Sequence, residues 1–195
     1  LYGEPFQKYA DNFELYLDPA AEHQIKLRRK NFTHPTSGNI DMTSMTADEA
    51  QLTIRAAVAA GFTDLKLTGE LSKTGIGGNW GTFINNKKIT KCDLTGVTDW
   101  GTTPTLPELA FANCTALQEV TLPDDMKVIG TGAFSGCAAL TTVNLSQVTW
   151  INLNAFWGCT SLETLALDNV TAIGQEAFYG CTGLETLKIP KCTQF

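Results

Sequence analysis

The six cysteines are the residues of this 195-residue sequence best suited to nucleophilic, redox or metal-binding chemistry. Cys181 lies in the stretch EAFYGCTGLETLKIP, residues 176–190, shortly after Glu176. A cysteine in this setting could be a reactive thiol, a metal ligand or half of a disulfide. The chain has only two histidines, His23 and His34. Residues 41–195 therefore offer no Ser-His-Asp triad, no Cys-His pair and no histidine metal ligand.

The surroundings of Cys181 recur, which argues against a unique reactive site. Four blocks begin at Leu106, Ile129, Ile151 and Ile173, with spacings of 23, 22 and 22 residues between their cysteines, from 137 − 114, 159 − 137 and 181 − 159. Three further columns keep the same register. They are Phe111, Phe134, Phe156 and Phe178; Leu117, Leu140, Leu162 and Leu184; and Leu122, Leu145, Leu167 and Ile189.

Each block predicts one coil of a solenoid. In LQEVTLP, apolar Val120 and Leu122 alternate with polar residues, which is typical of a short half-buried strand. In IGTGAFSGC, the apolar residues from Ile129 to Cys137 have a roughly helical spacing, which predicts a turn of helix or 3₁₀ structure. Stacking at about 4.8 Å would bury the apolar faces and bring each repeat phenylalanine against the next.

The recurring cysteines are accordingly predicted to be free, buried thiols that donate to nearby backbone carbonyls. Cys92 and Cys192 also match apolar positions, those of Val120 and Val170. A disulfide framework is the alternative for six cysteines in an exported chain. A Cys₄ zinc site fits less well, because ligands one coil apart lie in a line and not in a tetrahedron. We predict no metal, no cofactor and six thiols titratable after denaturation without reductant.

The pattern A-F-x-G/N-C-x-x-L-x-x-V/L-x-L/I resembles the BspA-like leucine-rich repeats, a bacterial cell-surface class. Ser146, Asp168, Asn152 and Leu153 depart from that pattern without touching its apolar columns. The resemblance implies an α/β fold: a right-handed solenoid with a curved parallel β-sheet and short helical or 3₁₀ turns on its convex side. It covers about residues 41–195, with regular 22–23-residue repeats over 106–195.

Residues 62–105 predict irregular first repeats with longer loops. Strands are expected in FTDLKLTGEL (62–71) and KCDLTGV (91–97), with Leu67 and Leu94 equivalent to Leu122. The glycine-rich segment LSKTGIGGNWGTF (71–83) lacks the G-K-[ST] ending of a phosphate loop, and we interpret it as a flexible turn.

Residues 46–61 predict an N-terminal capping helix. Thr46 and Glu49 form a capping box, and Gly61 suits the residue after the helix. Ile54, Val58 and Leu52 would lie against the first strand and cover the apolar end of the solenoid.

Residues 1–40 predict an accessory segment for which two alternatives stay open. Phe6, Tyr9, Phe13 and Tyr16 have helical spacing, yet FELYL also alternates as a strand. The next stretch could be a helix capped by Asp18 or the return strand of a hairpin. At the other end, the sequence stops where a further repeat would begin, which indicates either truncation or cover by another copy.

Composition narrows the function. The net charge of −6 argues against a nucleic-acid binder, and no apolar run reaches the roughly 18 residues of a membrane-spanning helix. The chain starts with Leu1, which indicates a processed or trimmed chain whose export signal would already be removed. An enzyme is disfavoured, because the adjacent acids Asp124 and Asp125 lie in an exposed turn without the burial that tunes a catalytic pair.

Three aromatic residues are the candidate partner-binding residues: Trp150, Trp157 and Tyr179. The variable positions of the expected sheet are small and mostly neutral, from Glu119 and Thr142 in one row to Thr121 and Asn144 in the next. The resemblance implies an exported, surface-displayed or extracellular module for protein binding or adhesion, with a host or matrix protein as partner. The alternatives are a carbohydrate-binding accessory module that uses the same aromatics, or aromatics that only pack over their own loops.

Overall fold

The computed structural model describes residues 13–17, 25–29, 35–78 and 81–194 of two compact units, 1–34 and 35–195. In the first unit, β1 (Phe13–Leu17) pairs antiparallel with β2 (Ile25–Arg29). The hairpin alternative is therefore confirmed for these two segments, and a helix there is wrong. The predicted helical positions Phe6 and Tyr9 and the predicted cap Asp18 lie outside the described residues.

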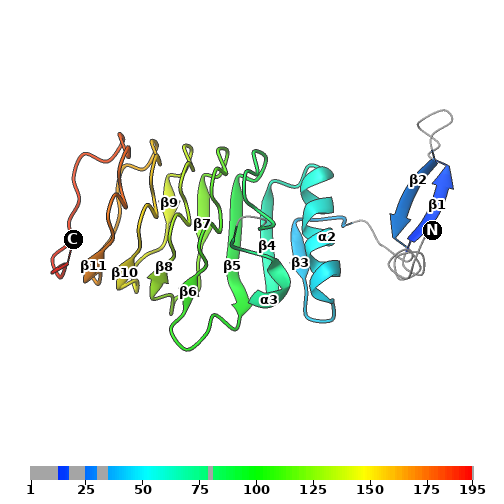
Figure 1. Ribbon diagram of the computed structural model, residues 1–195, viewed down its shortest axis with the longest axis horizontal. Helices are drawn as coiled ribbons and strands as arrows, with labels where there is room; N and C mark the ends of the chain where they lie inside the picture. The colour runs from blue at the N-terminus through cyan, green and yellow to red at the C-terminus, as the bar shows by residue number, and fades with distance from the viewer. Residues whose placement is uncertain (1–12, 18–24, 30–34, 79–80, 195) are drawn as a thin grey trace, which may run out of the picture. The chain divides into compact units, whose positions relative to one another are not determined.

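The second unit is a solenoid with a five-stranded parallel sheet along one side (Figure 1). Its strands run in the order β3 (Asn39–Asp41), β4 (Asp64–Glu70), β5 (Lys91–Thr98), β7 (Glu119–Thr121) and β9 (Thr142–Val143). Alternate side chains point into the core, so Leu67, Leu94 and Leu122 are fully buried as predicted. Cys92 lies opposite Val120, which confirms its predicted apolar position.

A second, four-stranded parallel sheet lies along another side of the same coils. Its two-residue strands are β6 (Thr105–Leu106), β8 (Val128–Ile129), β10 (Trp150–Ile151) and β11 (Ala172–Ile173). Leu106, Ile129, Ile151 and Ile173 stack in register as its inward residues. The prediction of helical structure at Ile129 was wrong, because the backbone there bonds to neighbouring coils and not within its own segment.

The segments that carry the A-F-x-G/N-C motif are successive tight turns. Within a coil, the Cys137 N–H donates to the Phe134 carbonyl at 3.0 Å, three residues back. Between coils, the Phe134 N–H donates to the Ala155 carbonyl at 2.8 Å, and the Phe156 N–H to the Ala177 carbonyl at 2.8 Å. Because every second N–H bonds to the next coil, a continuous helix cannot form.

Two positions in each turn segment have a left-handed backbone, with φ between 54° and 74°. These are the residue before the repeat alanine and the residue before the repeat cysteine: Leu109, Gly132, Asn154 and Glu176, and then Asn113, Gly136, Gly158 and Gly180. Glycine and asparagine tolerate this region best, which explains the G/N of the motif.

The phenylalanine rings form the predicted column through the core. Neighbouring centroids lie 5.1–5.6 Å apart, with interplanar angles of 4–22°. Phe83 extends the column by one ring, 5.3 Å from Phe111. The prediction of a flexible turn over 71–83 was therefore wrong for its described residues. The Thr82 hydroxyl donates to the Thr74 carbonyl at 2.8 Å, and this buried bond orders the segment after α3 (Leu71–Thr74). Trp80 lies outside the described residues.

The capping helix is α2 (Ala47–Ala59), and its predicted ends are confirmed. The Thr46 N–H donates to Glu49 Oε2 at 3.0 Å, and the Glu49 N–H donates to Thr46 Oγ1 at 3.3 Å. Gly61, at φ 99°, ends the helix, and its N–H donates to the Val58 carbonyl at 3.1 Å. Ile54 and Val58 are buried as predicted, and Leu52 is half-buried. The strand that precedes α2 is β3, so the helix belongs to the first coil and connects β3 to β4 (Figure 1).

The five-stranded sheet ends at β9. In the described chain, residues 163–166 and 185–188 donate no backbone hydrogen bond to the preceding coil, so the strands predicted for the last two repeats are wrong. At Asn144 the side-chain amide takes the place of the backbone in bonding to the preceding coil. It accepts a hydrogen bond from the Leu122 N–H at 2.7 Å and donates one to the Leu122 carbonyl at 2.9 Å. Leu165 and Leu187 stand where earlier coils have Val120 and Val143, and leucine lacks the β-branch that favours strands.

Candidate functional site

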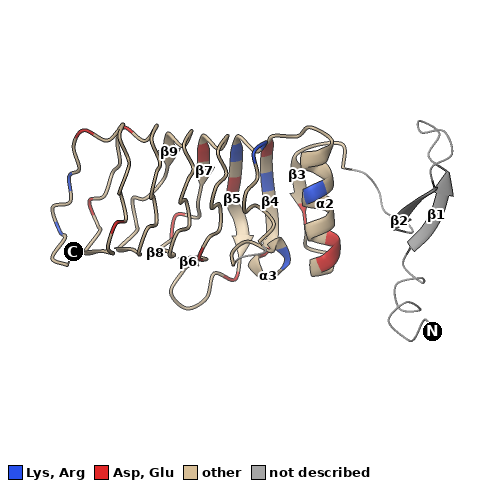
Figure 2. Cartoon of the chain, turned by 45° about the horizontal axis from the view of Figure 1, so that its top comes forward, with Lys and Arg blue, Asp and Glu red and all other residues tan. Residues whose placement is uncertain are grey.

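Charged residues gather on β4, β5 and β7 of the five-stranded sheet (Figure 2). Lys66 Nζ lies 3.3 Å from Asp93 Oδ2, and Lys91 Nζ lies 2.9 Å from Glu119 Oε2. Its hydrogen bond with Glu119 raises the pKa of Lys91. Within each pair the two opposite charges largely neutralise each other, so this face of the sheet carries charges of both signs without a large excess of either. The mostly neutral sheet face predicted from the sequence was based on positions from Glu119 onward, which follow β5 in the chain. The charges of β4 and β5 were therefore not predicted.

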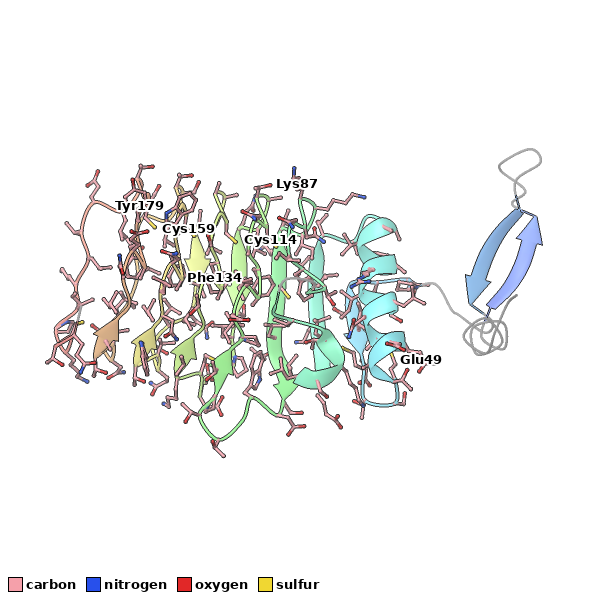
Figure 3. The ribbon with its side chains drawn as sticks, in the orientation of Figure 1. Glu49, Lys87, Cys114, Phe134, Cys159 and Tyr179 are labelled. Carbon is pink, nitrogen blue, oxygen red and sulfur yellow. The ribbon has the colours of Figure 1, made fainter. Side chains whose placement is uncertain are left out.

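The thiols form an inert column beside the phenylalanines (Figure 3). Each thiol of the turn segments donates to the carbonyl of the phenylalanine one coil earlier, at 2.9–3.2 Å, as predicted. The four pairs are Cys114 with Phe83, Cys137 with Phe111, Cys159 with Phe134, and Cys181 with Phe156. All six cysteines are free, so the disulfide alternative is wrong.

Burial keeps most of these thiols protonated. It raises the pKa of Cys114 to about 12 and raises the pKa of Cys92 and Cys137 further. The contact between Cys159 and Cys181, together with burial, raises the pKa of Cys159, and the same contact lowers the pKa of Cys181. Cys181 nevertheless remains buried and bonded to a carbonyl, which is a poor setting for a nucleophile.

Four large apolar side chains are exposed in the described chain: Trp150 at 51%, Leu153 at 43%, Trp157 at 42% and Tyr179 at 63%. Trp157 and Tyr179 stack on each other, with ring centroids 6.2 Å apart and an interplanar angle of 16°. We call these two residues the Trp157–Tyr179 pair. Each ring of the pair thus contacts the ring of the neighbouring coil, and part of both side chains faces solvent.

The repeat itself positions the pair. Each ring follows a repeat phenylalanine, and Phe156 and Phe178 stack at 5.4 Å with an interplanar angle of 5°. The Gly158 N–H donates to the Tyr179 carbonyl at 2.8 Å and fixes the register of the two turns. Because the backbone and the stacked phenylalanine rings are held in this way, the exposed rings are preorganised for a contact.

The structure brings together only two of the three predicted binding residues. Trp150 belongs to β10 in the four-stranded sheet, whereas Tyr179 lies at the opposite edge of the solenoid (Figures 1 and 3). Leu153 is an exposed residue that the sequence analysis did not select. The sequence could have indicated Leu153, because it is apolar where the equivalent residues of the other repeat blocks are the polar Glu108, Thr131 and Gln175.

The side-chain polar groups of the pair, an indole N–H that donates and a phenol hydroxyl that both donates and accepts, have no partner in the described chain. Within the described chain, neither Trp157 Nε1 nor the Tyr179 hydroxyl makes a hydrogen bond, in contrast to Trp100, whose Nε1 donates to the Val97 carbonyl at 2.7 Å. The pair therefore offers flat apolar rings, two donors and the acceptor of the Tyr179 hydroxyl. A surface of this kind can bind another molecule but has no nucleophile or acid–base pair of its own.

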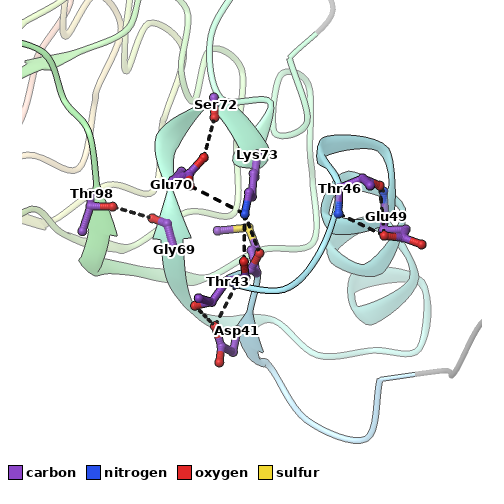
Figure 4. A network of polar contacts seen from close by, with 10 residues as sticks. Asp41, Thr43, Thr46, Glu49, Gly69, Glu70, Ser72, Lys73 and Thr98 are labelled. Carbon is purple, nitrogen blue, oxygen red and sulfur yellow. Dashed lines mark hydrogen bonds and ion pairs between the residues drawn. The ribbon is translucent and has the colours of Figure 1, made fainter.

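A polar network at the other end of the solenoid is structural (Figure 4). Lys73 Nζ donates to the Met42 and Thr43 carbonyls at 3.3 and 2.9 Å, and lies 3.8 Å from Glu70 Oε1. Hydrogen bonds from Thr43 lower the pKa of Asp41 beside it. These contacts tie β3 to β4 and α3.

The described residues include no group of three or more His, Cys, Asp and Glu side chains that could hold a metal ion. Among the same residues, no helix has the length and apolar character needed to cross a membrane.

A family model described as "BspA type Leucine rich repeat region" matches residues 82–195 in six copies. This chain belongs to the BspA-type leucine-rich repeat family. The six copies extend beyond the four regular blocks and begin at Thr82, beside the first ring of the phenylalanine column. Leucine-rich repeat proteins in general mediate protein interactions and are typically non-enzymatic.

Two solved structures resemble this BspA-type chain. One is a leucine-rich repeat protein of T. pallidum, with 20% identity and a TM-score of 0.49, covering 90% of this chain and 67% of that one. The other is a leucine-rich cell surface protein of Faecalibacterium prausnitzii, with 20% identity and a TM-score of 0.43, covering 90% and 52%. This chain thus spans about two thirds of the first and half of the second. A search of curated proteins found no match.

Proposed function

We propose that this BspA-type chain is a non-catalytic interaction module, displayed on the cell surface or outside the cell, that binds a protein through the Trp157–Tyr179 pair. The observation that carries the proposal is the exposure of two stacked aromatic rings on a rigid, repeated backbone. Tryptophan and tyrosine are the residues that most often dominate the binding energy of protein interfaces.

Adhesion to a host or extracellular-matrix protein is the biological role that we propose for this contact. Membership of a leucine-rich repeat family supports this role, because leucine-rich repeat proteins generally mediate protein interactions. The solenoid suits such a role, because its core needs no ligand for stability and its turns can change without disturbing the buried columns.

Binding of the purified chain to immobilised extracellular-matrix proteins and to neutral polysaccharides, measured by surface plasmon resonance, tests the proposal. The Trp157→Ala/Tyr179→Ala double variant should bind the protein at least about 30-fold more weakly, since hot-spot residues contribute about 2 kcal/mol or more.

Trp150→Ala is the matched control, because Trp150 is equally exposed but lies away from the pair. It should bind as the unaltered chain does. Equal binding by the double variant would remove the pair from the site. Binding to polysaccharides alone, lost in the double variant, would replace the protein partner with a carbohydrate.

A further inference from the structure

The Trp157–Tyr179 pair belongs to a stretch of the solenoid whose charged residues are all acidic. Residues 128–187 contain four carboxylates and no Lys, Arg or His. The four are Glu163, Asp168, Glu176 and Glu185. All of them are exposed, and none forms an ion pair with another described residue. Basic residues flank the stretch at Lys127 and Lys188, so the pair lies where the chain carries an unbalanced negative charge.

Two of these carboxylates share the coils of the aromatic pair. Glu163 follows Trp157 by six residues, and Glu185 follows Tyr179 by six, so the two acids occupy equivalent positions in neighbouring coils. The five-stranded sheet differs, because its lysines already have acidic partners within the chain. Charges that are paired within the chain gain little from a further partner. The unpaired carboxylates create a negative potential that favours a cation.

We infer that the pair binds an arginine-bearing basic segment of a protein partner, with a guanidinium group stacked on an aromatic ring. This inference rests on the proposed protein-binding function and specifies the chemistry of the partner. A cation over the face of an aromatic ring is attracted by the ring electrons, and tryptophan gives the strongest contact. Arginine suits the site better than lysine, because its planar guanidinium stacks on a ring and its fork of N–H groups matches a carboxylate.

The ring stack is open on the Trp157 side. Within the described chain Trp157 stacks on Tyr179 alone, with an interplanar angle of 16°. Ser135 occupies the equivalent position one coil earlier, and the Gly136 N–H donates to the Trp157 carbonyl at 2.7 Å to hold the two coils in register. A serine side chain is too short to cover an indole ring. A planar cation can therefore lie on the second face of Trp157 as the next layer of the stack.

The charge of this region argues against other partners. The carboxylates would repel an acidic protein or an anionic polysaccharide. A neutral sugar can stack on the rings, but it gains nothing from the negative potential. A basic segment uses both the rings and the charge, and electrostatic steering also speeds its approach.

The test is a titration of the whole chain with three ten-residue Gly-Ser peptides that carry arginines, lysines or citrullines at the same positions. Citrulline keeps the planar end group of arginine without its charge. Binding is followed by calorimetry and by the NMR shift of the Trp157 indole N–H. The arginine peptide should bind, the lysine peptide about 3-fold more weakly and the citrulline peptide at least about 10-fold more weakly. Added salt should weaken binding of the two charged peptides only.

Paired substitutions separate the local potential from the total charge of the chain. Glu163→Gln/Glu185→Gln keeps both rings and should weaken binding of the arginine peptide about 5-fold. Asp124→Asn/Asp125→Asn is the matched control, because it removes the same charge from an exposed turn outside residues 128–187. The control should bind the arginine peptide as the unaltered chain does.

The possible failures remain distinguishable. Equal binding of the arginine and citrulline peptides, or equal losses in the two paired variants, would overturn this inference. If Trp157→Ala/Tyr179→Ala loses matrix-protein binding but the unaltered chain ignores the arginine peptide, the inference falls and the proposed function stands. If the same double variant keeps matrix-protein binding and loses the arginine peptide, the proposed function fails, whereas the preference of the pair for arginine stands.

Discussion

The first and last coils of the solenoid share one core but are joined by different backbone bonds. From β3 to β9, neighbouring coils pair through the five-stranded sheet. In the last two coils that sheet is absent, and pairing continues through β8, β10 and β11 of the four-stranded sheet and through the turn segments. The phenylalanine and thiol columns run through both regions. The stacked phenylalanine and thiol columns are therefore a more constant feature of this repeat than any one strand.

Side-chain burial also differs between the two regions. Leu117 and Phe134, in the middle coils, are fully buried, whereas Phe178, Leu184 and Ile189 in the last coil are only partly buried. A solenoid residue gains its burial from neighbours on both sides. We therefore expect equal substitutions to have unequal costs along the column.

The largest expected effect comes from breaking the phenylalanine column. Phe134→Ala should lower the free energy of unfolding by about 3–5 kcal/mol, because it leaves a cavity between two stacked rings. Phe178→Ala should cost about half as much, since that ring stacks on one partner and is partly exposed. Urea denaturation measures both. Equal losses would contradict the difference in packing between the regions.

A smaller effect should follow from removing the ammonium group that ties the first coil to the second. Lys73→Met should cost about 1–3 kcal/mol, because it leaves the Met42 and Thr43 carbonyls without their charged donor. Lys91→Met is the control. It removes an exposed ion pair with Glu119, which should cost under about 1 kcal/mol. A Lys73 variant as stable as the control would show that water replaces the ammonium.

The left-handed turns should respond in opposite directions in the last coils. Glu176 has φ 55°, so Glu176→Gly should stabilise the chain by about 1 kcal/mol by relieving strain. Gly158→Ala should destabilise the chain by about the same amount, because its φ of 72° is unfavourable for a residue with a Cβ. The added methyl group would make only ordinary contacts, 3.9 Å from Gly136 Cα, so the cost comes from the backbone alone. Thermal unfolding of the two variants measures the shifts. A destabilising Glu176→Gly would mean that the side chain contributes more than its backbone costs.

The smallest effect expected is on pH dependence, and it should separate the two regions. Partial burial acts to raise the pKa of Asp93, but hydrogen bonds from Thr95 and contact with Lys66 outweigh it and lower the pKa below its usual 3.8. Because the folded pKa is depressed, the stabilisation is present above the unfolded value and is lost as pH falls through the folded one.

The protection of backbone amides from exchange, measured relative to the intrinsic exchange rate at each pH, should therefore fall in β4 and β5 below about pH 4, before it falls in β10 and β11. Asp93→Asn should remove this difference, at a cost under about 1 kcal/mol at neutral pH. An equal loss of protection in both sheets would show that Asp93 does not act locally.

The features that repeat or are local in the chain could be predicted from the amino-acid sequence alone. The phenylalanine column, the thiol-to-carbonyl bonds and the Thr46–Glu49 capping box were all predicted correctly, because each depends on spacing within one block or on a fixed period. The tertiary structure decided the four-stranded sheet, the end of the other sheet at Asn144 and the place of Phe83 in the column. It also decided which candidate aromatics meet, since it paired Trp157 with Tyr179 and left Trp150 apart. These features depend on bonds and ring contacts between coils about 22–28 residues apart in the chain, and such pairings follow from how the layers stack and not from the residues adjacent in sequence.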